Sequence, residues 1–372
     1  MPFIPFLPLL VMYLLIHRLS FAGGSRINMT GVLTSNNQGS FYSINVQSDS
    51  ATFNLLKTFS STVAGGACAV EDDIIRSLVL REGRLQLVNF NTTEKSKMSF
   101  IDLSNIGFIT PTVENMKLGV DWYLTSGRNV SDVFIGGGDS IGFLHMLNYE
   151  MNGDFSDIFE YGQGSKLSYS NSAFDHINNQ LWIQTVFNTN TNFSTANINN
   201  SKKYDIYVKQ YDLTTNSLLN IVKDPSNAQV IVSANNRIYT IGQCNTTSDV
   251  SFNYTTTNTC LWSLDPSQTI PIFTKEAELS KNWDKIMASV FSISDDVLQI
   301  IVRVKKVKNQ VEELVEPLVC NEASVCHRTR DATSFAGEGW SVASVDLKKM
   351  AVTNTILLSF PGSFDKTSKL AC

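Results

Sequence analysis

The sequence predicts an all-β protein built from repeated four-stranded antiparallel units. A strand–turn–strand phrase recurs six times, a tight-turn signal precedes five of these copies, and the spacing between the two signals leaves room for the remaining strands. The chain has 372 residues, which suits one large all-β domain or two average domains. Its hydrophobic content of 43% is enough for a sizeable core.

The recurring phrase is clearest in YVKQYDLTTNSLLNIV, around Asp212. In every copy an apolar or aromatic residue stands four places before an Asn or Asp, and another stands directly before it. This alternation predicts a strand, and a short polar side chain that bonds its own backbone predicts the start of a turn. The six turn-starting positions are Asn45, Asn89, Asn148, Asp212, Asp265 and Asp346.

The second signal is an acidic or amide pair ahead of an apolar run, as in EDDIIRSLVL, INNQLWIQTV, ANNRIYTIGQ and SDDVLQIIVRV, with a looser version in VSDVFIGGG. Such pairs favour tight turns because Asn and Asp tolerate unusual backbone angles. The step from turn to phrase is 16 residues from Asp73 to Asn89, but 33 from Asn179 to Asp212 and 50 from Asp296 to Asp346. The last three units therefore carry insertions between their second and third strands.

Four-stranded units repeating at this scale predict a β-propeller, a radial arrangement that leaves few exposed edges. Six blades fit the six phrases, and the gap of 81 residues between Asp265 and Asp346 leaves seven as an alternative. The first unit lacks an innermost strand, and the C-terminal segment ending in SKLAC is placed to supply it and close the ring.

The phrase Leu-x-x-Leu-Asp followed by a polar turn, as in LWSLDPSQT, resembles quinoprotein-type propeller repeats. The resemblance extends over nearly the whole chain after the N-terminal segment, on a short motif. It implies the propeller fold and no particular activity, because propellers host unrelated chemistries.

Six cysteines predict three disulfides. Cys68 and Cys372 would lie on neighbouring inner strands, so a bond between them would lock the ring. The other bonds expected from proximity are Cys244–Cys260 and Cys320–Cys326, each bracketing part of an insertion. A metal site is the alternative, although no Cys-x-x-Cys occurs and only His327 lies nearby.

The N-terminus predicts a secreted protein. Residues 1–22 contain an apolar run followed by Ser20 and Ala22, as before a signal cleavage site, which leaves residues 23–372 as the propeller domain. An uncleaved signal anchor or an endolysosomal lumen is the alternative. Seven Asn-x-Ser/Thr sequons predict glycosylation, at Asn28, Asn91, Asn129, Asn192, Asn199, Asn245 and Asn253.

Charge and hydropathy exclude some partners. The net charge of −5 argues against nucleic-acid binding, which needs a basic surface. No later apolar segment has the roughly 20 residues of a membrane-spanning helix, so we expect no stable membrane insertion after cleavage. We expect a monomer.

Function is predicted only by class. All three insertions emerge on one face of a propeller, and 307–339 is the strongest binding candidate, although drifted Asn/Thr-rich loops would look similar. The first hypothesis is an extracellular scaffold for a protein or glycan ligand. The alternative is a hydrolase or lyase with a channel-mouth site, with calcium as an optional metal; no cofactor, metal ligands or catalytic residues are assigned. His145, His176 and His327 form no metal-binding spacing. Acidic or histidine side chains converging at the channel would favour the enzyme.

Overall fold

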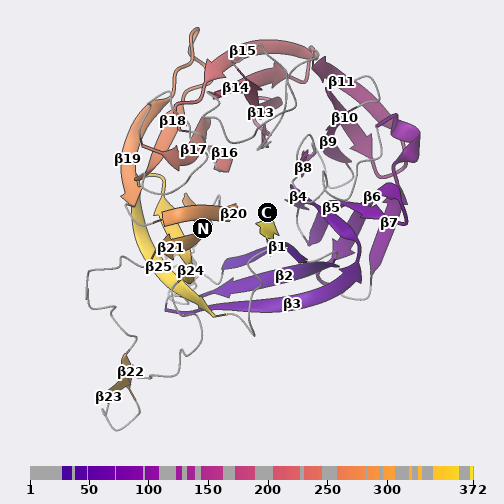
Figure 1. Cartoon of the computed structure of the whole chain (residues 1–372). Helices are drawn as coiled ribbons and strands as arrows, with labels where there is room; N and C mark the ends of the chain where they lie inside the picture. Colours follow the sequence, from indigo (N-terminus) through magenta and orange to yellow (C-terminus); the bar gives the residue numbers. More distant parts are fainter. Residues whose placement is uncertain are drawn as a thin grey trace, which may run out of the picture.

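A computed structural model describes the chain in the ranges 27–35, 38–47, 49–71, 73–94, 97–108, 123–127, 132–138, 144–161, 172–188, 204–226, 230–244, 258–280, 283–292, 296–305, 318–320, 326–328, 338–359 and 369–371. In these ranges the elements are β-strands and one short 3₁₀-helix, η2. The strands form a ring of antiparallel sheets around a central opening (Figure 1). The predicted all-β propeller is confirmed.

Four of the sheets contain four consecutive strands each. The first has β4 (Thr62–Glu71), β5 (Ile74–Arg81), β6 (Arg84–Asn91) and β7 (Met98–Asp102), followed by η2 (Ser104–Ile106). The second has β8 (Tyr123–Ser126), β9 (Asp132–Gly138), β10 (Leu144–Glu150) and β11 (Phe155–Tyr161). The third has β12 (Ser172–Asp175), β13 (Gln180–Asn188), β14 (Tyr204–Asp212) and β15 (Ser217–Lys223). The fourth has β16 (Val230–Ala234), β17 (Arg237–Gln243), β18 (Thr259–Leu264) and β19 (Thr274–Ser280).

The remaining sheet has eight strands and joins the two ends of the chain. One half, the β26–β3 half, has β26 (Lys369–Ala371), β1 (Ile27–Ser35), β2 (Gln38–Val46) and β3 (Ala51–Ser60). The other, the β20–β25 half, has β20 (Trp283–Ser292), β21 (Val297–Lys305), β24 (Glu338–Asp346) and β25 (Ala351–Ser359). Strands β22 (Leu318–Cys320) and β23 (Cys326–Arg328) pair with each other and form a separate two-stranded sheet.

Hydrogen bonding thus divides the described strands into five large sheets, and the prediction of six or seven separate blades is wrong in that sense. The physical reason is a parallel pairing between the outer strands β25 and β3, Leu358 with Ala51 and Ser359 with Thr52, which merges the first and last units. At the centre, β26 pairs antiparallel with β1. The C-terminal strand therefore completes the sheet that begins the chain, as the sequence predicted.

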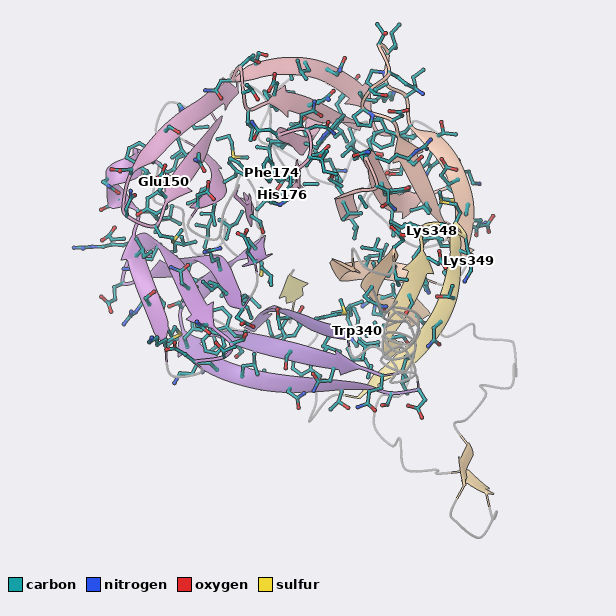
Figure 2. The ribbon with its side chains drawn as sticks, turned by 180° about the vertical axis from the view of Figure 1, so that it is seen from behind. Glu150, Phe174, His176, Trp340, Lys348 and Lys349 are labelled. Atoms are coloured by element: carbon teal, nitrogen blue, oxygen red, sulfur yellow. A yellow bond between two sulfur atoms is a disulfide. The ribbon has the colours of Figure 1, made fainter. Side chains whose placement is uncertain are left out.

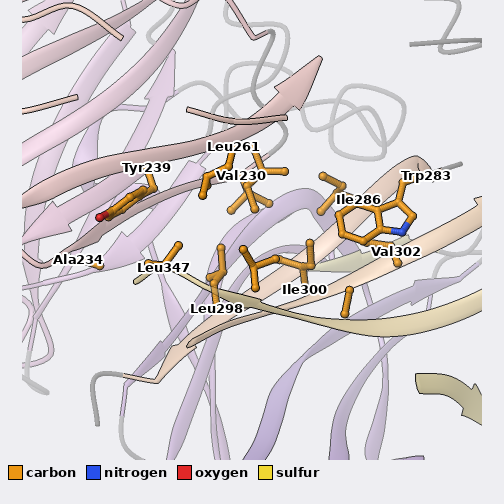
Figure 3. Packing of buried hydrophobic residues seen from close by; sticks show 13 residues of the cluster. Val230, Ala234, Tyr239, Leu261, Trp283, Ile286, Leu298, Ile300, Val302 and Leu347 are labelled. Atoms are coloured by element: carbon orange, nitrogen blue, oxygen red, sulfur yellow. The ribbon is translucent and has the colours of Figure 1, made fainter. Parts of the chain in front are cut away.

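The strands are apolar on both faces because each sheet is packed between two neighbours. In β6, Leu85 and Leu87 join a cluster shared with the β8–β11 sheet, while Val88 and Phe90 join a cluster shared with the β26–β3 half. This is the period of two that the repeat predicted. Figure 3 shows the corresponding layer between the β16–β19 sheet and the β20–β25 half, where Leu261 and Tyr239 lie near Ile300 and Leu298.

The tight turns lie where the amide and acidic pairs predicted them. Asn235 and Asn236 both have positive φ, at 51° and 55°, and so do Asn179 at 52° and Asp296 at 51°. Left-handed backbone is least costly for Gly, Asn and Asp. These pairs therefore close first-to-second hairpins in three consecutive units.

The copies of the recurring strand–turn–strand phrase differ between those with Asp and those with Asn at the turn position. Asp212, Asp265 and Asp346 each start a turn, because Oδ1 accepts the backbone N–H two residues on, at 2.7 Å from Thr214, 2.9 Å from Ser267 and 3.0 Å from Lys348. The prediction is confirmed for these three.

For Asn45, Asn89 and Asn148 the prediction is wrong. Their strands continue to Val46, Asn91 and Glu150, so the turn begins later. The Nδ2 atom of Asn89 lies 3.6 Å from the Sδ atom of Met151 in the next sheet, while its backbone stays in the ladder opposite Ser99. A carboxamide at this position faces a neighbouring sheet instead of capping a turn.

Candidate functional site

The three insertions leave the ring from closed, paired bases. Asn188 pairs with Tyr204, Gln243 with Thr259, and Lys305 with Glu338, in three successive units. Because these residues occupy the same place in each unit, the three connections leave on one face, which we call the insertion face. The insertions between these bases lie largely outside the described residues.

A disulfide closes the base of the second insertion. Cys244 and Cys260 are bonded, as their spacing predicted, and Cys260 is fully buried. The ladder extends one step further, since the Cys244 N–H donates to the Asn258 carbonyl at 2.9 Å. The Trp262 indole N–H donates to the Gln243 carbonyl at 3.1 Å. The insertion is therefore attached to a rigid double strand.

A buried polar network holds the connection from β15 to β16 beneath the same face. Asp224 accepts hydrogen bonds from Gln184 Nε2 at 3.1 Å and from the Ser226 N–H and hydroxyl at 2.8 and 2.6 Å. The Ser226 carbonyl accepts from the Gln243 N–H at 2.6 Å. A Cβ atom on Gly242 would stand 2.3 Å from that carbonyl, so only glycine allows this close approach. The third and fourth sheets are thereby linked next to two insertions.

The remaining cysteines are partly described. Cys68 takes part in a disulfide, while its predicted partner Cys372 lies outside the described residues. Strand β26, which ends one residue before Cys372, contacts β4, which contains Cys68. Cys320 and Cys326 stand directly opposite each other in the β22–β23 ladder.

Among the seven sequons the structure describes the side chain of Asn91. Its Oδ1 accepts the N–H groups of Thr93 and Glu94 at 2.9 and 3.0 Å and the Thr93 hydroxyl at 2.6 Å. Asn91 therefore starts the β6–β7 turn, with the sequon presented on a hairpin. Asn28 is described by its backbone, in β1, and Asn129, Asn192, Asn199, Asn245 and Asn253 lie outside the described residues.

The three histidines, whose spacing matches no metal-binding motif, lie on three different sheets. His145 is half-buried in β10, His176 is exposed in the β12–β13 turn with its ring 4.4 Å from that of Phe174, and His327 is in β23. Figure 2 shows Phe174 and His176 toward the inner side of the ring. In the described part of the chain no group of three His, Cys, Asp or Glu side chains could hold a metal ion. The glycines Gly136–Gly138 continue strand β9 and do not form a phosphate-binding turn.

One charged cluster is buried between two sheets and was not visible in the sequence. Arg76 in β5 is 1% exposed, and its Nη1 atom lies 3.8 Å from Glu71 Oε2. Burial lowers the pKa of Arg76, whereas the charges of Glu71 and Asp132 raise it. Asp132 belongs to the next sheet, so the cluster bridges two units through charge. Its burial makes it part of the packing and not a ligand site.

A cleft of about 470 Å³ opens on the opposite face, which we call the turn face. It lies between the third and fourth sheets and is lined from three segments, 177–180, 235–237 and 265–267. These segments are the β12–β13, β16–β17 and β18–β19 turns with the first residues of the following strands. The sequence indicated the turns but not their meeting. Amide pairs in successive repeats, at 178–179 and 235–236, were the available signal.

Internal hydrogen bonds fix most polar side chains of this cleft. Asn178 Nδ2 donates to Asp175 at 2.8 Å, and Gln180 Oε1 accepts from Gln210 at 2.8 Å. Asn235 bonds Asp296, and together with Lys348, the larger influence, it lowers the pKa of that carboxyl. The Ser267 hydroxyl and N–H lower the pKa of Asp265 below its ordinary value.

Comparisons with known proteins found similar solved structures but no family. No protein-family model and no curated protein matches the chain. TolB from Acinetobacter baumannii is 11% identical with a TM-score of 0.40, over 68% of this chain and 55% of that one. A putative TolB from Agrobacterium tumefaciens is 11% identical with a TM-score of 0.43, over 90% of this chain and 89% of that one.

The β-propeller domain of the Trilobed protease from Pyrococcus furiosus is 8% identical with a TM-score of 0.40, over 80% and 71%. The chain spans about half the length of the first TolB and most of the other two structures. Identities and TM-scores this low carry no argument about this chain. The protein is a β-propeller, a class that its own strand order already defines. Within the described ranges, no helix has the length and apolar character needed to cross a bilayer.

Proposed function

We propose that this chain is a secreted, glycosylated β-propeller that binds an extracellular protein or glycan through its three insertions. The observation that carries the proposal is the set of paired bases at Asn188–Tyr204, Gln243–Thr259 and Lys305–Glu338. Long connections on a rigid frame are the usual place for recognition. The Cys244–Cys260 bond closes the second base, and the Asp224–Ser226 connection links its strand β17 to β13, which leads into the first insertion.

We further propose that the eight-stranded sheet is two blades, which makes a ring of six. In the described part of the sheet, two parallel residue pairs join its halves. Moreover, Ile301 and Val342 of the β20–β25 half pack against Met29 and Tyr42 of the β26–β3 half in a cluster of their own. Two halves that face each other across an apolar layer behave as neighbouring blades and not as one continuous sheet.

Secretion is supported by two described features. A buried disulfide such as Cys244–Cys260 persists in oxidising compartments. The sequon at Asn91 lies on a surface hairpin, as a glycan acceptor requires.

Replacing the insertions one at a time tests the binding proposal. An Asn-Gly pair in place of 189–203 or of 306–337 would join bases that are already paired, by the favoured two-residue hairpin turn. We expect each variant to fold, with loss of cell-surface binding by the one whose insertion makes the contact. Insertions of the same length and scrambled sequence are the matched control. Unchanged binding by a propeller that lacks all three insertions, with 245–257 also replaced by Asn-Gly, would contradict the proposal.

Secretion is tested separately by expressing the full chain in eukaryotic cells. We expect a protein in the medium that starts at Gly23 and loses mass on enzymatic removal of N-glycans. An unglycosylated intracellular product that retains Met1 would refute this part without touching the fold.

A further inference from the structure

The turn-face cleft differs in chemistry from most small-molecule sites. Its volume of about 470 Å³ lies within the usual range of roughly 300–1,000 Å³. Most such pockets are lined mainly by apolar and aromatic side chains. Here seven of the nine described lining residues are polar, and four of them carry carboxamides: Asn178, Gln180, Asn235 and Asn236. An open, carboxamide-rich cleft suits a ligand that is itself rich in hydrogen-bonding groups.

Two of the carboxamides are held at one end and open at the other, and a third is open at both ends. Asn178 uses Nδ2 to bond Asp175, so its Oδ1 is left as an acceptor. Gln180 uses Oε1 to accept from Gln210, so its Nε2 is left as a donor. Asn236 makes no side-chain hydrogen bond within the described part of the chain. The cleft therefore offers donors and acceptors side by side, on groups that lose little freedom when a ligand binds.

The charges of the cleft favour a neutral ligand. Arg237 Nη1 donates to Ser263 Oγ at 2.8 Å and lies 3.5 Å from Glu276 Oε1, so its charge is already balanced. Asp265 uses Oδ1 for its turn and keeps Oδ2 as a further acceptor. An anionic ligand would meet the carboxylates of Asp265 and Glu276 around a single guanidinium. Like charges at such distances disfavour binding.

Two aliphatic side chains complete the lining. Ile177 is 74% exposed and Pro266 stands across from it in the β18–β19 turn. They offer apolar surface to the C–H face of a ring. A peptide would need an unpaired strand edge or an apolar side-chain pocket, and the lining provides neither, because it consists of closed hairpin turns.

We propose that this cleft binds a neutral saccharide. Each sugar hydroxyl both donates and accepts, and a carboxamide can do both toward neighbouring hydroxyls. The ligand would dock between the third and fourth sheets on the turn face, opposite the insertions. This site is independent of the partner proposed for the insertion face.

The test uses the full secreted chain on an array of glycans ending in neutral sugars, with sialylated and sulfated glycans alongside. We expect retention of a subset of the neutral glycans. The free sugars identified in this way should give saturation-transfer NMR signals with Kd on the order of 1 mM, because none of the described lining residues is aromatic.

Asn236→Gly removes a carboxamide while keeping a residue that accepts the positive φ of this turn. It should weaken glycan binding about 10-fold, as expected for lost hydrogen bonds to a ligand. Asn216→Gly is the matched control, at a φ of 48° in a turn outside the cleft, and should bind as the wild type does. The variants without insertions should also retain glycan binding, which separates this proposal from the one above.

Three results would overturn the inference. They are no retention of any glycan, retention of charged glycans only, and equal binding by the wild type and Asn236→Gly. An array of extended peptides tests the alternative that the cleft binds a peptide. Peptide binding that Asn236→Gly abolishes, with no glycan bound, would assign the cleft to peptides instead.

Discussion

The strands β1–β11 and the strands β12–β25 use the same sequence phrase in two different ways. In the first region the phrase carries Asn, the strand continues past it, and the second-to-third connections are short, as at Glu82–Gly83 between β5 and β6. In the second region it carries Asp, the turn starts at once, and the connections on the opposite face become long insertions.

The difference follows from the charge and hydrogen-bonding groups of the two side chains. An ionised carboxylate accepts hydrogen bonds only and finds donors in the exposed N–H groups of a turn. A carboxamide can remain in a strand, next to another sheet, without burying a charge. Asn89 does this, although its Oδ1 is buried without a hydrogen-bond partner among the described residues. The same repeat position thus lies within a strand in the first region and starts a surface turn in the second.

The largest expected effect breaks the contact between the two regions. Phe134 of β9 is fully buried in the cluster that joins the β8–β11 sheet to Leu181 and Tyr211 of the next sheet. Phe134→Ala should lower the free energy of unfolding by about 3–5 kcal/mol, from lost burial and the cavity left behind. Urea denaturation followed by tryptophan fluorescence measures it. Two separate unfolding transitions in the wild type would show that the two regions unfold independently. That result would contradict the importance of this contact.

The next largest effect comes from exchanging the two residue types. Asn89→Asp should destabilise by about 2–3 kcal/mol near neutral pH, because it buries a charge beside Met151. Asp212→Asn should cost less, about 0.5–1 kcal/mol, since an amide oxygen can still accept from Thr214. Thermal and urea unfolding of both variants provides the comparison. Equal losses would mean that the residue type at this position does not distinguish the regions.

Acid should affect the second region through its turn-starting carboxylates. Hydrogen bonds from Thr214, Ser267 and Lys349 are the largest causes that lower the pKa values of Asp212, Asp265 and Asp346 below 3.8. A depressed folded-state pKa gives stability that is present above the unfolded value and is lost as the pH falls through the folded one. Replacing all three by Asn should flatten the loss of stability below about pH 4, the ordinary range of the Asp carboxyl. A variant with an unchanged pH profile would rule these groups out.

The smallest effect concerns two equivalent turn ends within the second region. Asn216 and Met350 each stand four residues after the turn-starting Asp and have φ of 48° and 51°. Left-handed backbone is unfavourable for methionine, so Asn216→Met should cost about 1 kcal/mol. Met350→Asn should be close to neutral, because relief of strain offsets lost contact with Val345 and its neighbours. Melting temperatures of the two variants decide this, and a stabilising Asn216→Met would contradict it.

Much of the fold followed from local patterns. The period of two, the amide pairs at 178–179 and 235–236 and the Asp turns predicted strands and hairpins because these signals act over a few residues. The closure of the ring by β26 followed from counting strands. The merger of β25 with β3 could not be predicted, since it depends on how far two outer strands approach each other in space.

Some features of the candidate sites could likewise be predicted from local patterns, and others could not. Local patterns predicted where the insertions begin, which cysteines bracket one of them, and which residues start three of the turns. They did not predict that the Ser226 carbonyl leaves room only for glycine at 242, that Arg76 is buried beside Glu71, or that three turns from two sheets meet around Asn236 and Arg237. Hydrogen bonds within a hairpin are fixed by neighbours in the chain, whereas a cleft between sheets exists only after the apolar layers have set the angle and distance between them.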